Sequence, residues 1–164
     1  MSGKLKGKVA IVTGGGRGIG KAIAEAYAEA FNAGDLDTLA DLLADDFQFS
    51  GPVPEPVGRD QFLGLMELMW NAFPDIRFNT RLVGINRNVV HFTNQLAGTH
   101  TGDLDLSFMG MGVIPPTGRS FSMAREDGES VIADGYIIST HVQPTEGAGL
   151  MAILHQLGVK VPGM

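Results

Sequence analysis

The chain has 164 residues, which fits a single domain, and 44% of them are hydrophobic, which is enough for one core. It contains no cysteine, which excludes disulfides, thiolate metal sites and cysteine nucleophiles. The net charge is −6, the basic residues form no stripe, and no apolar run is long enough to span a membrane. We therefore predict a cytoplasmic protein with no nucleic acid and no membrane partner.

The first predicted elements are a strand over Lys8–Thr13, a glycine-rich turn over Gly14–Gly20 and an alanine-rich helix. Glycines between a strand and a helix let the backbone approach a pyrophosphate at the helix N-terminus. This stretch resembles the start of short-chain dehydrogenases/reductases, whose pattern T-G-x-x-x-G-x-G is matched by Thr13, Gly14, Gly18 and Gly20.

That resemblance ends near Phe31. The family's Tyr-x-x-x-Lys pair is missing, because the residues four positions after Tyr27 and Tyr136 are Phe31 and Thr140. The further parallel strands of a nicotinamide-binding sheet are missing as well. We therefore expect residues 1–20 to be a leader that binds no cofactor, and residues 21–164 to form the functional domain. Nucleotide binding is the weakest of the functional hypotheses.

Three helices are predicted after the leader, from apolar residues at helical spacing near 21–31, 36–43 and 59–73. Strands are indicated at 47–51, 75–85, 88–99, 119–125, 130–133 and 136–142, with Asp-Gly sequences between the last three, and a short helix closes the chain at 149–157. This order lacks strand–helix alternation, so it predicts an α+β fold: three N-terminal helices packed on a curved, mostly antiparallel sheet that encloses an apolar pocket.

Several segments resemble the SnoaL-like polyketide cyclase family, which has the nuclear-transport-factor-like cone fold. They are AYAEAFNAGDLDTLADLLADDFQFSGP at 26–52, GTHTG at 98–102, PPTGR at 115–119 and QLG at 156–158, and the resemblance spans about residues 22–162. It implies a cone-shaped domain that binds a small hydrophobic molecule. It also implies a cofactor-independent cyclase, isomerase or hydrolase acting on a polyketide-like, steroid-like or epoxide substrate.

Such reactions need a base beside a carbonyl or a water, and a donor that faces the developing oxyanion. His100, near the end of a predicted strand, is the first candidate base, although a histidine that fixes a turn fits the sequence equally. Asp103 lies either along the pocket or in a solvated loop, and Arg119 is either the partner of an acid or an exposed cation. Active relatives carry an aspartate after the last strand; that place falls near Thr145, and Glu146 is its candidate substitute.

The ligand-binding residues are predicted from two elements. The third helix contributes Trp70, Met66 and Phe73 as one wall of the pocket, and the strand that leads to His100 contributes Phe92 and Asn94 opposite it. No metal and no cofactor are predicted. Because the open sheet exposes its convex face, we expect a homodimer. The alternative to an enzyme is a non-catalytic ligand-binding or dimerisation module.

Overall fold

The computed structural model describes residues 16–53 and 55–160, with side chains from Gly20 onward. The predicted leader strand at 8–13 lies outside these residues. Four helices are described: α2 (Gly16–Ala33), α3 (Leu36–Leu42), α4 (Arg59–Ala72) and α5 (Leu150–Gln156). In this part of the chain, no helix combines the length and the apolar character that crossing a membrane requires.

Helix α2 begins earlier than the sequence predicts. It starts at Gly16, so Gly18 and Gly20 lie inside the helix and the expected turn does not extend to them. The alanine-rich sequence that follows favours helix strongly enough to continue it backward through these glycines. The helix buries its side chains at helical spacing, including Ile23, Tyr27 and Phe31.

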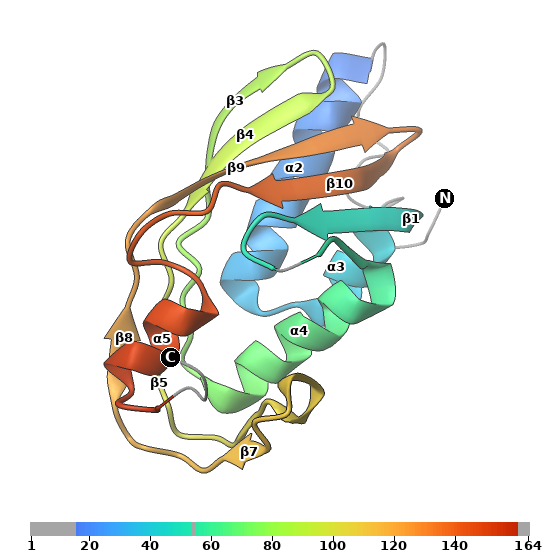
Figure 1. The fold of residues 1–164 in the computed structure, drawn as a ribbon. Coiled ribbons are helices and arrows are strands. Elements are labelled where there is room, and N and C mark those ends of the chain that lie inside the picture. Colours follow the sequence, from blue (N-terminus) through green and yellow to red (C-terminus); the bar gives the residue numbers. More distant parts are fainter. Residues whose placement is uncertain (1–15, 54, 161–164) are drawn as a thin grey trace.

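The main sheet has six strands in the order β2-β1-β10-β9-β4-β3. Only the pair β1 and β10 is parallel, so the sheet is mostly antiparallel. Together with the helices that cover it, this confirms the predicted α+β fold (Figure 1). The strands are β1 (Leu43–Ser50), β2 (Val57–Gly58), β3 (Arg81–Asn86), β4 (Val89–Asn94), β9 (Glu126–Ala133) and β10 (Tyr136–Val142).

Two small antiparallel pairs extend the fold beyond the main sheet. Strand β5 (Ala97–Thr99) pairs with β8 (Ser120–Ser122), and β6 (Leu104–Asp105) pairs with β7 (Val113–Ile114) around a 3-10 turn, η1 (Ser107–Met109). Helix α5 lies beside β5 and β8, at the opposite end from the β3–β4 hairpin (Figure 1). The predicted strand at 88–99 is thus divided into β4 and β5.

Strand β9 corrects the prediction of a turn near Asp127-Gly128. The strand runs without interruption from Glu126 to Ala133, because Gly128 has a packing role rather than a turning role. The ring of Phe92, on β4, covers it: a Cβ atom at this position would lie 2.4 Å from Phe92 Cζ. An Asp-Gly sequence is a turn signal only where no neighbouring side chain needs the space.

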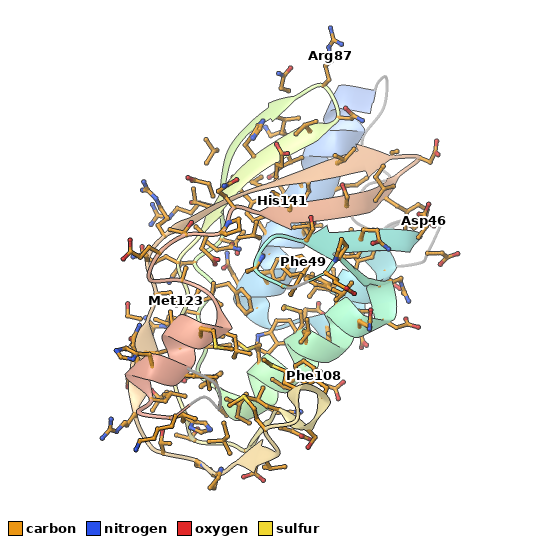
Figure 2. All side chains as sticks on the ribbon, viewed as in Figure 1. Asp46, Phe49, Arg87, Phe108, Met123 and His141 are labelled. Carbon is orange, nitrogen blue, oxygen red and sulfur yellow. The ribbon has the colours of Figure 1, made fainter. Side chains whose placement is uncertain are left out.

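A group of aromatic rings packs together in the interior between the sheet and the helices. Phe62 on α4 lies 5.1 Å from Phe47 and 4.8 Å from Phe49, between ring centroids, and Phe31 lies 5.2 Å from Phe78. Figure 2 labels Phe49 in this space. The predicted homodimer stays a prediction; large apolar side chains exposed on the edge strand β3 are Leu82 and Val83.

Candidate active site

A small cavity lies between helix α2 and the inward face of the main sheet. Its volume is about 10 Å³, which is space for a single water molecule. An organic ligand therefore has to displace side chains here. The lining comes from α2, the start of β3 and the three central strands of the sheet: Ala24, Tyr27, Ala28, Phe31, Thr80, Leu82, Val90, Phe92, Ser130, Ile132 and Ile137.

Three buried hydroxyl groups form a chain behind the lining of this cavity, whose own surface is apolar. Tyr27 Oη lies 2.9 Å from Thr140 Oγ1, and Ser130 Oγ lies 2.8 Å from the same oxygen. Three hydroxyls carry three protons, but two hydrogen bonds use only two of them. The third proton has no acceptor among the described residues. Burial raises the pKa of Tyr27, against a smaller opposite effect of its bond to Thr140, so the phenol stays protonated and remains a donor.

A carboxyl group, Glu126, lies on the same inward face of β9. Glu126, Gly128, Ser130 and Ile132 alternate with outward-facing residues, and Glu126 is only 5% exposed. Within residues 20–53 and 55–160 its carboxyl group has no hydrogen-bond or ion-pair partner. Burial alone raises the pKa of Glu126 from 4.5 to about 7. This carboxyl group therefore takes up and releases protons near neutral pH.

Asn94 on β4 is the direct cross-strand neighbour of Glu126. Its Oδ1 accepts a hydrogen bond from Thr80 Oγ1 at 2.8 Å. Thr80 is fixed in turn, since its backbone N–H donates to Asn32 Oδ1 at 2.9 Å and its carbonyl accepts from Asn32 Nδ2 at 3.1 Å. These bonds set the orientation of the Asn94 amide. They leave its Nδ2 group without an acceptor in the described part of the chain.

Phe92 lies between these two polar features. Its ring covers Gly128, which stands between Glu126 and Ser130 on the inward face of β9. The same side chain lines the cavity beneath α2. This one ring therefore stands between the cavity beneath α2 and the Glu126–Asn94 pair.

His100 occupies a different region, at the end of β5. It is completely buried, and its Nδ1 accepts the backbone N–H of Thr117 at 3.2 Å and lies 3.0 Å from Thr117 Oγ1. The ring proton is therefore on Nε2, which is buried and has no partner among the residues that the structure describes. Burial lowers the pKa of His100, against smaller effects of the Gly102 backbone and Asp103. This arrangement favours the reading in which His100 fixes a turn.

The other three predicted catalytic residues are exposed and do not line the cavity. Asp103 follows the GTHTG segment and acts on His100 through its charge. The guanidinium of Arg119 covers Gly158, just after α5, where a Cβ atom would lie 2.7 Å from Nη1. Glu146 lies in the loop between β10 and α5.

The predicted ligand-binding residues are divided among three places. Phe92 lines the cavity, and Asn94 faces inward beside Glu126. Phe73 is fully buried, 5.5 Å from the ring of His100 and 4.9 Å from that of Phe121. Trp70 and Met66 are half-buried on α4, with the Trp70 ring 5.9 Å from that of Phe78. Helix α4 thus places its aromatic residues against the core rather than along the cavity.

Sequence reasoning missed the inward-facing polar residues of the sheet and of α2. Glu126 and Ser130 were hidden by the Asp-Gly sequence between them, although alternation through REDGESVIA was a signal for a continuous strand. Tyr27 and Thr140 meet across 113 positions of the sequence, which local patterns do not reveal. Among the described residues, no three His, Asp or Glu side chains gather as metal ligands.

The chain belongs to the SnoaL-like polyketide cyclase family, whose model matches residues 21–144. A search of curated proteins found no match. Among solved structures, the chain is similar to wild-type IdmH from Streptomyces antibioticus, described as a candidate polyketide cyclase, with 29% identity and a TM-score of 0.60. The similarity covers 85% of this chain and 99% of IdmH.

Two further structures share the fold at lower identity. AclR from Streptomyces galilaeus, described as a candidate hydroxylase, is 23% identical with a TM-score of 0.65, over 88% of this chain and 83% of AclR. An LEH-like epoxide hydrolase of M. tuberculosis is 16% identical with a TM-score of 0.58, over 85% of this chain and 92% of the hydrolase. At these identities the similarity shows the fold alone.

Proposed function

We propose that this SnoaL-like domain binds a small hydrophobic molecule bearing a carbonyl oxygen, in the space beneath α2, and catalyses its cyclisation or isomerisation without a cofactor. The observation that carries the proposal is the buried Tyr27–Thr140–Ser130 hydroxyl chain, which has one proton to donate. A donor held in apolar surroundings binds a carbonyl oxygen and stabilises negative charge on it more strongly than water does.

The surroundings of the hydroxyl chain fit such a ligand. The rest of the cavity lining is almost entirely aliphatic or aromatic, so a ring system gains from burial there. Fixed donors need no reorganisation when charge develops on the ligand oxygen, which is the requirement of enolate chemistry. The family match and the description of IdmH as a candidate cyclase support a reaction of this class.

The test compares 2-acetonaphthone with 2-isopropenylnaphthalene, which replaces the carbonyl oxygen by a CH₂ group of similar shape. If the hydroxyl chain donates to the ligand, the ketone binds about fivefold more tightly, as expected for one hydrogen bond. The double variant Tyr27→Phe/Ser130→Ala keeps the apolar lining and loses this preference. Calorimetric titration of both compounds measures the ratio of the two dissociation constants.

Ser139→Ala is the matched control, because it removes a hydroxyl from β10 outside the hydroxyl chain and the cavity lining. It should keep the preference for the ketone. Equal affinity of the wild-type protein for ketone and alkene contradicts the oxygen-binding role. Binding of the ketone without any turnover of carbonyl compounds instead favours the non-catalytic ligand-binding module.

A further inference from the structure

We propose that Glu126 and Asn94 form the acid–base site of this domain: the Glu126 carboxylate removes a proton from the carbon beside a ligand carbonyl, and the Asn94 amide donates to the carbonyl oxygen. This inference rests on the proposed function, since it needs a carbonyl compound in the interior. It assigns the proton transfer to residues separate from the hydroxyl chain that binds the ligand beneath α2.

The isolation of Glu126 is the first observation behind the assignment. Glu126 is only 5% exposed as a residue, and its carboxyl oxygens, which are not among the fully buried atoms without a partner, still reach solvent. The charged and titratable groups of the neighbouring strands lie on the other face of the sheet. There Asp127 and Glu129 are exposed, Glu129 pairs with His91 at 3.9 Å, and His141 bonds to Ser50.

No cation therefore neutralises Glu126 from the strands around it, and burial alone sets its proton affinity. The carboxyl group is half-ionised near neutral pH, which is the condition under which one group both removes and returns a proton. An exposed glutamate is too weak a base for this at the same pH.

The orientation of Asn94 is the second observation. Residues directly opposite in an antiparallel pair have Cβ atoms about 5 Å apart, so the Asn94 amide and the Glu126 carboxyl share one inward-facing site. Because Thr80 holds Oδ1, the free Nδ2 group is the part of the amide left to donate. Thr80 and Asn32 are positioning residues for this donor.

The proton transfer by Glu126 needs no reactant other than the carbonyl compound. The Glu126 carboxylate takes the proton, and the electron pair of the broken C–H bond moves through the carbon–carbon bond to the carbonyl oxygen, giving an enolate that accepts from Asn94. In an isomerisation the proton returns from Glu126 to another carbon of the enolate. In a cyclisation the enolate carbon bonds to a second carbonyl carbon, and Glu126 gives its proton to the new alkoxide.

The separation of the two polar features also defines the substrate class. Glu126 and Ser130 are four residues apart on one strand, which places their Cα atoms about 13 Å from each other. A ligand that reaches both is elongated, carries oxygen functions toward both ends, and displaces the ring of Phe92 that lies between them. Fused-ring or chain compounds with several carbonyl groups meet these conditions.

The probe for the base is 5-nitrobenzisoxazole, a flat carbon acid that opens when a base removes its ring C–H proton. The C–H electron pair then forms the nitrile and the N–O bond breaks to give a coloured phenolate. We expect the wild-type rate to rise with pH around a midpoint near 7. Glu126→Gln should lower the rate at about pH 8 at least about 100-fold.

Three further variants complete this experiment. Asn94→Ala should lower the rate about tenfold and keep the midpoint, because it removes only a donor to the phenolate oxygen. Glu129→Gln, on the outer face of the same strand, is the matched control and should retain the wild-type rate. Glu126→Asp keeps an acid but moves it back by one methylene, so we expect an intermediate rate. This variant tests the assignment if Glu126→Gln folds poorly.

A Glu126→Gln variant that keeps both the rate and its pH dependence overturns the assignment, and so does a wild-type rate no higher than that of Glu126→Gln. These outcomes are separate from the test of the hydroxyl chain. If the ketone is preferred over the alkene but elimination does not depend on Glu126, the proposed binding function stands and this acid–base site is wrong. If elimination depends on Glu126 but the ketone has no advantage, the acid–base site stands and the oxygen-binding role fails.

Discussion

Glu126 and His100 are both buried and titratable, but the regions around them differ. His100 lies at the end of β5, where Thr117 bonds to its Nδ1 and the Phe73 ring packs 5.5 Å away. Glu126 lies on the central strand β9, four residues before the cavity-lining Ser130, and no described residue bonds to it. A loop therefore holds the histidine through Nδ1, although its Nε2 has no partner among the described residues, whereas no described residue bonds to the Glu126 carboxyl group.

This contrast separates two uses of a buried polar group. A group whose hydrogen bonds close within the fold holds elements together, and its removal costs stability. A group left without partners costs stability where it stands, so it is a candidate for chemistry. His100 Nε2 also lacks a partner among the described residues, so our proposal for β9 rests on the place of Glu126 opposite Asn94 together with its raised pKa.

The largest expected effect on stability is at Glu126. Its pKa is 4.5 when the chain is unfolded and about 7 when it is folded, so the folded state binds more protons between these values. The free energy of unfolding therefore falls as the pH rises through this range, by at most about 3 kcal/mol, because solvent that reaches the carboxyl oxygens reduces the effect. In Glu126→Gln this fall is absent, and the variant becomes more stable than wild type above about pH 7.

Urea unfolding at a series of pH values measures this difference between wild type and variant. Subtracting Glu126→Gln from wild type cancels the titration of all other groups, including the pKa values of Asp75 and Asp105 that hydrogen bonds lower. A constant difference between wild type and Glu126→Gln across this pH range means that Glu126 ionises as an ordinary exposed carboxyl group.

A smaller effect is expected for His100→Ala. The substitution removes a fully buried ring and leaves the Thr117 N–H without its acceptor, which costs about 2 kcal/mol of unfolding free energy at about pH 8. The pH dependence has the opposite sign to that of Glu126. Because burial lowers the pKa of His100 from 6.5, the unfolded chain binds the extra proton, and the contribution of His100 to stability is lost as the pH falls below about 6.5.

The rate of 5-nitrobenzisoxazole elimination tests most directly whether His100 is the base. His100→Ala should leave the rate of the folded protein and its midpoint unchanged, since the imidazole lies away from the cavity lining. A large loss of rate with stability intact would return the role of base to His100 and remove the contrast between the two regions.

Much of the fold could be predicted from the sequence. Helical spacing in the first half of the domain predicted α2, α3 and α4, and alternation predicted most of the long strands. The exceptions have tertiary causes. Gly128 interrupts the strand signal because Phe92 needs its space, and the glycines before residue 21 continue a helix that the alanine-rich segment favours. Local patterns carry no information on which side chain a distant strand places over a glycine.

The candidate site was less predictable for a related reason. Asn94 and Phe92 were expected to face the interior, from strand alternation alone, and they do. The side chains that complete the site come from elements brought together by the sheet, as Glu126 meets Asn94 only through the pairing of β4 with β9. His100 looked catalytic because histidine titrates near neutral pH in isolation, but its burial and its bond to Thr117 reverse that expectation.

The most direct test of the acid–base site is a carbon-13 NMR titration of the Glu126 side-chain carboxyl group, assigned by comparison with Glu126→Gln. The acid–base site predicts a midpoint near 7 for this carboxyl group. A Glu126 midpoint near 4.5 would contradict it.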